Sequence, residues 1–444
     1  MSYQAAKPLQ IAPARTLSGT VSVPGDKSIS HRALVLASLA VGESSISGLL
    51  EGDDVLATAA ALRAMGAMIE RGDDGTWRIR GVGVGGLLQP PGALDMGNSG
   101  TSTRLLAGLV ASHPIHATFI GDASLSRRPM GRIIDPLSLM GADITASPGS
   151  RLPMMVGGGC PGVPIRYMLP VASAQVKSAI LLAGLNTPGI TRVIEPVATR
   201  DHSERMLTGF GAEIAIEETD RGRLIAITGE AELKPQHIVV PGDPSSAAFW
   251  AVAASIVPGA ALTIRNVGLN PTRAGLFTAL RMMGADITEC DPRSVGGEPV
   301  ADLLVRHASL TAVDVPPELA PSMIDEYPAL FVAAAFAAGR SVARGAQELR
   351  VKESDRIATM AAALGKCGVT VEEFADGLAV TGSGGEAIAG GATVATHLDH
   401  RIAMAMTVAG LHARAAVTID DAAPVATSYP DFFATLARLG GAAC

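Results

Sequence analysis

Basic side chains in this sequence recur in polar loops at the starts of predicted helices, in both halves of the chain. They are Lys27, Arg32, Arg104, Arg127, Arg128, Arg200, Arg350, Lys352, Arg356 and Arg401. Free N–H groups at a helix N-terminus attract anions, and the arginine fork suits carboxylate and phosphate. Any one of these side chains alone would be interpreted as a solvated surface charge. Their recurrence at helix starts predicts a site for a small ligand with several negative charges, between two domains.

Two acidic segments add carboxylates to these basic loops. Asp325 and Glu326 stand at a predicted helix start, where N-capping alone could explain Asp325. Glu353 lies inside the basic segment 352–356, next to opposite charge. A surface salt-bridge network could explain both segments. Beside bound anions, however, Asp325 and Glu353 become candidates for proton transfer.

Histidines and cysteines give little support for metal or covalent chemistry. His397 and His400 could share a helix face, but no third ligand is indicated nearby, so no metal site is predicted. No Ser-His-Asp order with a nucleophile elbow is present. The cysteines are scattered singly outside the arginine-bearing loops and are predicted to be reduced thiols of a cytosolic protein. They are Cys160, Cys290, Cys367 and Cys444.

The elements that must position these side chains form a repeat. A helix ending of the form Leu-x-x-hydrophobic-Gly-small occurs six times, at intervals of about 74 residues. The copies centre on Gly66, Gly141, Gly211, Gly284, Gly368 and Gly440. A glycine that closes a helix, followed by an apolar strand start, is typical of a helix C-cap. The sequence therefore predicts one supersecondary unit used six times.

Each repeat also contains a second, alanine-rich helix behind a polar loop with an N-capping residue. Two of these loops match closely, because Val23-Pro24-Gly25-Asp26-x-Ser28 recurs as Val240-Pro241-Gly242-Asp243-x-Ser245. The offset is about half the chain, which indicates that a half of three repeats was duplicated. We therefore expect hinges near 22–25 and 240–243. They divide the chain into one domain of residues 23–240 and a discontinuous domain of residues 1–22 plus 241–444.

Composition sets the class of the protein. Of the 444 residues, 48% are hydrophobic but only 3% aromatic, so the core is predicted to consist of small aliphatic side chains. Runs of β-branched residues between the helices are typical of strands, so the sequence predicts a mixed α/β fold. The net charge of -7 argues against a nucleic-acid partner or a membrane surface. No leader or membrane-spanning run is recognisable, so we expect a cytoplasmic protein and a monomer.

The motifs together resemble one family, and they run in order over nearly the whole chain. They are Pro24-Gly25-Asp26-Lys27-Ser28-Ile29-Ser30-His31-Arg32, Gly97-Asn98-x-Gly100-Thr101-x-x-Arg104, Arg128-Pro129-Met130-Gly131-Arg132, Ser173-Ala174-Gln175-x-Lys177-Ser178, Asp325-Glu326-Tyr327-Pro328, Arg350-Val351-Lys352-Glu353-Ser354-Asp355-Arg356 and Asp399-His400-Arg401. This set is similar to 5-enolpyruvylshikimate-3-phosphate synthase, and several of the motifs resemble those of the bacterial class II branch. The resemblance implies the enolpyruvyl-transferase fold, in which two domains of three βαβαββ units each close on the substrates.

The resemblance also implies a reaction and its residues. Phosphoenolpyruvate gives its enolpyruvyl group to the 5-hydroxyl of shikimate 3-phosphate, a step of aromatic amino acid biosynthesis, with no metal or cofactor. Asp325 is the expected base, Glu353 the expected acid, and Lys27 stabilises developing charge. The expected contacts of shikimate 3-phosphate are Lys27, Ser28, Arg32, Ser173, Ala174, Gln175, Arg200, Asp325 and Lys352. Those of phosphoenolpyruvate are Lys27, Gly100, Thr101, Arg128, Gln175, Arg356 and Arg401.

Two positions distinguish this chain within the resemblance. Class I members carry a Lys that contacts phosphoenolpyruvate where this sequence has Thr427, so Thr427 is not assigned to the site. In the family the inhibitor glyphosate occupies the phosphoenolpyruvate position, and tolerant class II members carry Ala where this chain has Gly100. The glycine has no methyl group to collide with the inhibitor, so the resemblance implies sensitivity to glyphosate.

Two alternatives remain at this point. UDP-N-acetylglucosamine enolpyruvyl transferase shares the fold, but that family usually carries a reactive cysteine in the region of Arg127 and Arg128. The other alternative is a non-catalytic binding protein for a phosphorylated metabolite. Such a protein would gain nothing from the carboxylates Asp325 and Glu353.

Overall fold

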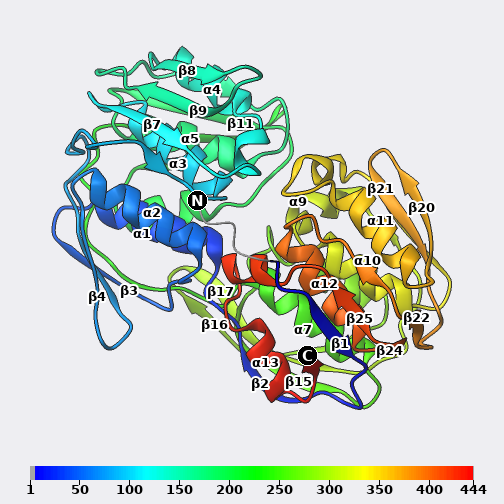
Figure 1. Cartoon of the computed structure of the whole chain (residues 1–444). Coiled ribbons are helices and arrows are strands. Elements are labelled where there is room, and N and C mark those ends of the chain that lie inside the picture. The colour runs from blue at the N-terminus through cyan, green and yellow to red at the C-terminus, as the bar shows by residue number, and fades with distance from the viewer. Residues whose placement is uncertain (1–5, 444) are drawn as a thin grey trace. The chain divides into compact units, whose positions relative to one another are not determined.

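The computed structural model describes residues 6–443, and the chain forms two compact units (Figure 1). One unit is residues 25–240, and the other joins the chain up to Pro24 with the chain from Pro241 onward. Each unit has its own hydrophobic core. Cys444, one of the four predicted thiols, lies outside the described residues, as does most of the N-terminal segment on which the expectation of no leader rests.

Six four-stranded sheets repeat one topology, in which the first two strands pair parallel and the next two pair antiparallel. The sheets of unit 25–240 are β14 (His237–Val239), β3 (Glu43–Ser47), β5 (Trp77–Arg80) and β4 (Met68–Arg71); β6 (Leu94–Asp95), β7 (His116–Ile120), β9 (Arg151–Gly157) and β8 (Asp143–Ser147); and β10 (Arg166–Met168), β11 (Ile190–Glu195), β13 (Gly222–Thr228) and β12 (Ile214–Thr219).

The sheets of the discontinuous unit follow the same order. They are β2 (Ser18–Ser22), β15 (Ala261–Gly268), β17 (Glu298–Arg306) and β16 (Asp286–Val295); β18 (Asp314–Val315), β19 (Arg340–Ala343), β21 (Gly377–Thr381) and β20 (Thr370–Phe374); and β23 (Thr393–Val394), β25 (Val417–Ile419), β1 (Leu9–Ala12) and β26 (Ala442–Ala443). A parallel pair, β22 (Ile388–Gly390) and β24 (Ala413–Ala415), accompanies them.

The strand before each passage of the chain from one unit to the other pairs within its own unit. β2 directly precedes the first helix of unit 25–240, yet it pairs with β15 of the discontinuous unit. β14 directly precedes the first helix after Pro241, yet it pairs with β3 of unit 25–240. Each unit therefore completes its first sheet with a strand that is distant in the sequence.

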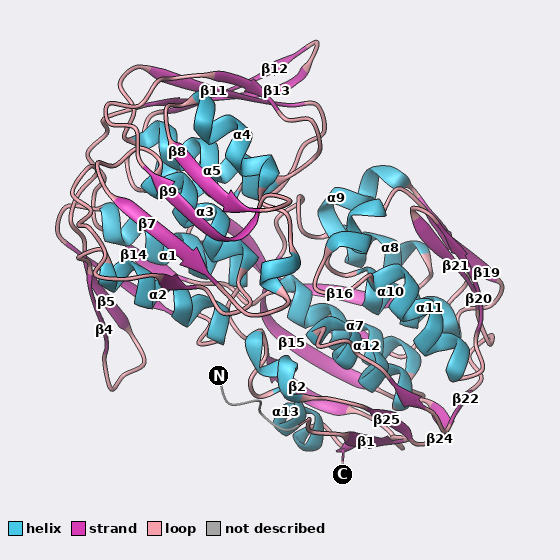
Figure 2. Cartoon of the chain, turned by 45° about the horizontal axis from the view of Figure 1, so that its top comes forward, coloured by secondary structure: helices cyan, strands magenta, loops and turns pink. Residues whose placement is uncertain are grey.

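Six inner helices are buried on nearly every side, and most of their residues are apolar or small. They are α1 (Lys27–Leu39), α3 (Gly100–Val110), α5 (Ala174–Leu185), α7 (Pro244–Ile256), α10 (Tyr327–Phe336) and α12 (His400–Gly410). Figure 2 shows these helices enclosed by the sheets of their own unit. Small side chains allow close packing: a Cβ on Gly108 of α3 would lie 2.3 Å from the carbonyl oxygen of Ala179 in α5.

Six outer helices end in the repeated glycine. They are α2 (Asp53–Ala64), α4 (Gly131–Leu139), α6 (His202–Gly209), α8 (Gly275–Met282), α11 (Arg356–Lys366) and α13 (Phe432–Arg438). Gly66 after α2 has φ +102°, and the N–H groups of Gly66 and Ala67 bond back to the carbonyls of Arg63 and Leu62. This is a Schellman ending, which needs the left-handed conformation that glycine adopts freely. The other five glycines also have positive φ and the same pair of bonds, as the sequence repeat predicts.

Polar side chains cap five of the six inner helices, as expected from their loops. The caps are Asp26, Ser99, Ser173, Asp243 and Asp399. The exception is α10, which follows the short helix α9 (Ala320–Met323) and begins after Glu326 without a side-chain cap. Short 3-10 turns complete the described chain: η1 (Leu125–Arg127), η2 (Pro317–Leu319), η3 (Gln347–Val351) and η4 (Ala423–Thr427).

Two further observations bear on the sequence analysis. Among the described residues, no helix has the length and apolarity needed to cross a membrane. His397 has φ +53° and precedes α12, so it does not share a helix face with His400. That part of the histidine interpretation was wrong.

Candidate active site

The start of α1 brings Lys27, Ser28 and Arg32 to one end of unit 25–240. Asp26 caps the helix by accepting the N–H of Ile29 at 2.9 Å. Arg32 is buried and donates to three different places: Nε to Ser203 Oγ (2.7 Å), Nη2 to Ser178 Oγ (2.6 Å) and Nη1 to the carbonyl of Ser28 (3.0 Å). Both serines come from segments far along the chain. The Arg32 guanidinium is therefore held in one orientation at the meeting point of α1, α5 and α6.

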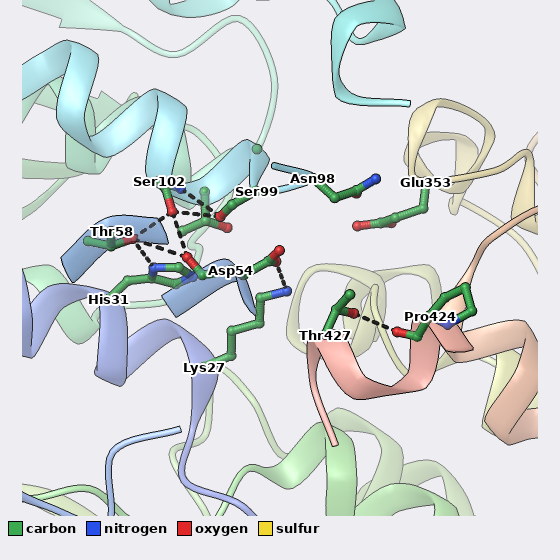
Figure 3. Close-up of polar contacts among 12 residues, drawn as sticks. Lys27, His31, Asp54, Thr58, Asn98, Ser99, Ser102, Glu353, Pro424 and Thr427 are labelled. Carbon is green, nitrogen blue, oxygen red and sulfur yellow. Dashed lines mark hydrogen bonds and ion pairs between the residues drawn. The ribbon is translucent and has the colours of Figure 1, made fainter. Parts of the chain in front are cut away.

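Lys27 belongs to a polar network that joins three helices (Figure 3). Its ammonium pairs with Asp54 of α2, and both side chains are largely buried. The Asp54 carbonyl accepts Ser102 Oγ of α3 at 3.1 Å, and Ser102 Oγ lies 2.6 Å from Thr58 Oγ1. The network therefore fixes the Lys27 ammonium relative to the start of α3.

His31 extends this network from below the surface. Its Nδ1 lies 2.8 Å from Thr58 Oγ1, and its Nε2 is buried without a hydrogen-bond partner among the described residues. Burial, and then the charges of Lys27 and Arg32, hold the pKa of His31 well below its ordinary value. The imidazole is therefore neutral at physiological pH, and it adds no charge beside Lys27.

The N-termini of α3 and α5 meet through Gln175. Its amide donates to Thr101 Oγ1 (2.9 Å) and accepts from Arg104 Nη1 (2.7 Å). A Cβ built on Gly100 would lie 2.9 Å from Arg104 Nη1 and 3.3 Å from Arg128 Nη1. Gly100 thus faces two guanidinium groups, and a methyl group there would press on both.

Other predicted residues of this unit lie on neighbouring segments. Arg128 follows η1 and donates to Asn98 Oδ1 at 2.5 Å, next to the start of α3. Ser173 caps α5 through Val176 N–H, and Ala174 is the first residue of that helix. Arg200 lies in the loop between β11 and α6, where it is partly buried.

In the discontinuous unit, Arg356 is the centre of the predicted site. Its guanidinium lies 2.5 Å from Glu353 Oε2, 2.9 Å from Asp399 Oδ2 and 3.3 Å from Asp325 Oδ1. Burial acts to lower the pKa of Arg356, but the three carboxylates outweigh it and raise that pKa above its ordinary value. The guanidinium therefore stays charged and holds the three carboxylates around it.

Asp399 is the buried anchor of this cluster. It also accepts Ser354 Oγ (3.0 Å) and, as the cap of α12, the N–H of Arg401 (3.0 Å). Burial acts to raise the pKa of Asp399, but Arg356 outweighs it and the pKa falls below its ordinary value. Asp399 is therefore ionised. Asp325 and Glu353 are the carboxylates of this cluster that lie nearer to solvent.

The geometry removes both simpler explanations for the two predicted carboxylates. Asp325 is not an N-cap, because α10 starts after Glu326; it instead contacts Lys352 Nζ at 3.2 Å and Arg356. Nor is this a surface network, because the side chains of Asp325, Glu353 and Arg356 are 14%, 20% and 1% exposed. A partly covered carboxylate beside fixed cations can exchange protons with a bound molecule.

Arg401 is held by the backbone and by a second buried chain of charges. Its Nη1 donates to the Asp325 carbonyl (3.0 Å) and lies 3.7 Å from Glu326 Oε1. Glu326 accepts Ser245 Oγ, and Arg273 Nη2 donates to the same hydroxyl at 2.8 Å. Glu326 thus links Arg401 to the start of α7.

Thr427 stands at the position of the class I lysine and provides no cation. Its hydroxyl donates to the carbonyl of Pro424 within η4 at 2.8 Å (Figure 3). This contact is local to the turn, which agrees with leaving Thr427 out of the predicted site.

Each unit therefore gathers its own share of the predicted residues. Several neighbours that hold them were not assigned to the site from the sequence: Asp54, Asn98, Ser178, Ser203, Arg104, Arg273, Glu326 and Asp399. Five of them, Asn98, Arg104, Ser178, Glu326 and Asp399, stood inside recognised motifs and could have been found there. Among the described residues, no group of histidine, cysteine or acidic side chains is arranged to hold a metal ion.

Comparison with known proteins decides the family. A family model described as EPSP synthase (3-phosphoshikimate 1-carboxyvinyltransferase) matches residues 11–436. The chain belongs to the EPSP synthase family. Its relatives named 3-phosphoshikimate 1-carboxyvinyltransferase include that of Sphingopyxis alaskensis, 66% identical over 99% of this chain and 100% of the relative. Another, from Zymomonas mobilis, is 65% identical over 98% and 96% of the two chains.

Solved structures agree with the family. An EPSP synthase from Acinetobacter baumannii superposes with a TM-score of 0.87 at 45% identity, covering 98% of this chain and 99% of that chain. The predicted enolpyruvyl-transferase fold and the predicted enzyme class, a transferase of the shikimate pathway, are confirmed. The matches favour this class over both alternatives, a UDP-N-acetylglucosamine enolpyruvyl transferase and a non-catalytic binding protein.

Proposed function

We propose that this chain transfers the enolpyruvyl group of phosphoenolpyruvate to the 5-hydroxyl of shikimate 3-phosphate and releases inorganic phosphate. The observation that carries the proposal is that Asp325 and Glu353 both contact the buried guanidinium of Arg356. Anion binding alone gains nothing from carboxylates, whereas an addition–elimination reaction needs one group to accept a proton and another to donate one.

In the addition step, Asp325 accepts the proton of the 5-hydroxyl while the oxygen bonds to C2 of phosphoenolpyruvate. Glu353 gives a proton to the methylene carbon, which becomes a methyl group, and a tetrahedral ketal phosphate results. The elimination step reverses the proton transfers: Glu353 removes a proton from the methyl group, the C2–O bond to phosphate breaks, and Asp325 gives its proton to the departing phosphate. The contact of Arg356 with both carboxylates supports their separate roles, because one fixed cation sets their positions.

Shikimate 3-phosphate is proposed to bind the fixed donors of unit 25–240. Arg32, Ser28, Ser173, Ala174, Gln175 and Arg200 form this set, with Lys27, Asp325 and Lys352 completing it. The three-way anchoring of Arg32 supports the assignment, because a guanidinium already held in place loses little freedom when it binds phosphate.

Phosphoenolpyruvate is proposed to bind Lys27, Gly100, Thr101, Arg128, Gln175, Arg356 and Arg401. The two guanidinium groups that face Gly100 support this choice, since the ligand carries a carboxylate and a phosphate. Lys27 stabilises the negative charge that develops during addition, and its ammonium is already held by Asp54. We propose that these steps need no metal or cofactor. We further propose that the enzyme is cytoplasmic and monomeric, with no nucleic-acid or membrane partner.

Phosphate release tests the function. Purified protein mixed with phosphoenolpyruvate and shikimate 3-phosphate should release phosphate, and omission of either substrate should abolish the release. Replacement of shikimate 3-phosphate by UDP-N-acetylglucosamine separates the rival enzyme. Release only with the nucleotide sugar would contradict the proposal, and tight binding of both substrates without release would favour a binding protein.

A further inference from the structure

A buried ion cluster lies beside the proposed shikimate 3-phosphate contacts but belongs to none of them. Lys177 of α5 is fully buried, and its Nζ lies 2.9 Å from Glu195 Oε2 and 2.7 Å from Glu204 Oε1. The contact to Glu204 lacks hydrogen-bond geometry, and the carboxylate oxygens of Glu204 have no hydrogen-bond partner among the described residues. The cluster therefore holds two carboxylates on one ammonium away from water.

The two carboxylates stand at the two ends of one loop. Glu195 is the last residue of β11, and Glu204 lies in the first turn of α6. Between them runs the segment 196–203, which is the loop with Arg200 followed by the first two residues of α6. The Lys177 ammonium on α5 thus contacts the residue on each side of this segment.

Further hydrogen bonds connect this ion cluster to the residues beside Arg200 and to Arg32. Thr199, directly before Arg200, donates its hydroxyl to the second oxygen of Glu195. Ser203, directly before Glu204, accepts Arg32 Nε at 2.7 Å and lies 2.7 Å from Ser178 Oγ, one residue after Lys177. Lys177, Glu195 and Glu204 therefore fix the positions of Thr199, next to Arg200, and of Ser203, which binds Arg32.

Stability alone is a weak reason for such a cluster. Burying three charges is costly, and replacement of buried ion pairs by apolar residues of similar volume is often neutral or stabilising. The fixed geometry of the loop is what the cluster supplies and what an apolar core would not specify. We propose that Lys177 is a positioning residue, which holds the segment 196–203 so that Arg200 and Arg32 meet the phosphorylated substrate. This inference rests on the proposed function of those two arginines.

The test removes the charges together, because Lys177→Met alone would leave two buried carboxylates without a counter-ion. The triple variant Lys177→Met, Glu195→Gln, Glu204→Gln keeps the side-chain volumes and the acceptor for Thr199. We expect it to fold, with its dissociation constant for shikimate 3-phosphate raised about tenfold or more, as for a misplaced binding group. The turnover number and the Michaelis constant for phosphoenolpyruvate should stay within about twofold of wild type, as for changes away from a site.

The control neutralises an ion pair of the same unit whose side chains are exposed, Arg80→Met with Glu43→Gln, whose atoms are 2.8 Å apart. It should leave every constant unchanged. A second readout needs no substrate: trypsin should cut after Arg200 at least several-fold faster in the triple variant than in wild type or control, because the loop is no longer held.

The outcomes separate this inference from the proposed function. Unchanged affinity for shikimate 3-phosphate in the triple variant, or an equal loss of turnover and of phosphoenolpyruvate binding, would overturn the positioning role. If wild type itself does not bind shikimate 3-phosphate, the proposed function fails. The tryptic comparison then still decides, since equal cleavage rates after Arg200 would show that Lys177 does not hold the loop.

Discussion

Replacement of Arg356 by lysine tests the arrangement of the carboxylates most sharply. The guanidinium reaches three carboxylates with three different nitrogen atoms, at 2.5, 2.9 and 3.3 Å. A single ammonium keeps the positive charge but cannot occupy all three directions. The variant Arg356→Lys should therefore fold with Asp325 and Glu353 no longer held in fixed relation.

The size of the effect follows from these contacts. Lysine loses about two of the three charge-assisted hydrogen bonds, each worth roughly 1.5–3 kcal/mol. The retained charge, acting at an effective dielectric constant of about 20, offsets part of that loss. A remainder of about 3 kcal/mol corresponds to a fall in kcat/KM of about 100-fold.

Arg350 offers a matched control in the same segment. It also contacts two carboxylates, Asp355 at 2.7 Å and Glu373 at 2.9 Å, but those side chains are 38% and 42% exposed and are not assigned to the proposed site. Arg350→Lys should change kcat/KM by less than about threefold, since surface ion pairs contribute little. Steady-state phosphate release measured for both variants decides the question. Equal losses in the two variants, or near-normal activity of Arg356→Lys, would refute the reasoning.

Three further predictions concern the two carboxylates, Gly100 and His31. Asp325→Asn and Glu353→Gln should each lower turnover by about two to four orders of magnitude, with shikimate 3-phosphate affinity within about tenfold; near-normal turnover in both would contradict their roles. Gly100→Ala places a methyl group 2.9 Å from Arg104 Nη1 and should raise the glyphosate inhibition constant far more than the Michaelis constant for phosphoenolpyruvate, whereas equal inhibition constants would exclude Gly100 as the determinant. Because the folded pKa of His31 is depressed, its contribution to stability is present above about pH 6.5 and is lost below it at up to about 1.4 kcal/mol per pH unit. The melting-temperature gap between wild type and His31→Asn should therefore narrow on acidification, and a constant gap would oppose this.

Local features of the fold could be predicted from the sequence because their signals are local. Gly66 and its five counterparts each close a Schellman ending that only a few neighbouring residues determine. The helix caps Asp26 and Asp399 are also written in short motifs. By contrast, the pairing of β2 with β15 and of β14 with β3 could not be predicted, because a strand's composition does not identify its partner strand.

The site shows the same division. Arg32 was predicted from its motif, but its contacts with Ser178 and Ser203 were not, because these serines lie 146 and 171 positions away in the sequence. No periodicity or spacing connects such residues. The helix start at Asp325 could have been placed better, because Pro328 favours the first turn of a helix and moves the start of α10 past Asp325.

The central claim is that carboxylates of this chain carry out an addition–elimination between the two substrates. Nuclear magnetic resonance of one reaction in D2O tests it most directly, with ³¹P signals for phosphate and product and ¹H signals for the product methylene. Because the methylene carbon gains a solvent proton and later loses one of three from a methyl group, the account predicts equal amounts of phosphate and enolpyruvyl product, with deuterium in the product methylene. Product formed without deuterium, or phosphate released without the enolpyruvyl product, would contradict it.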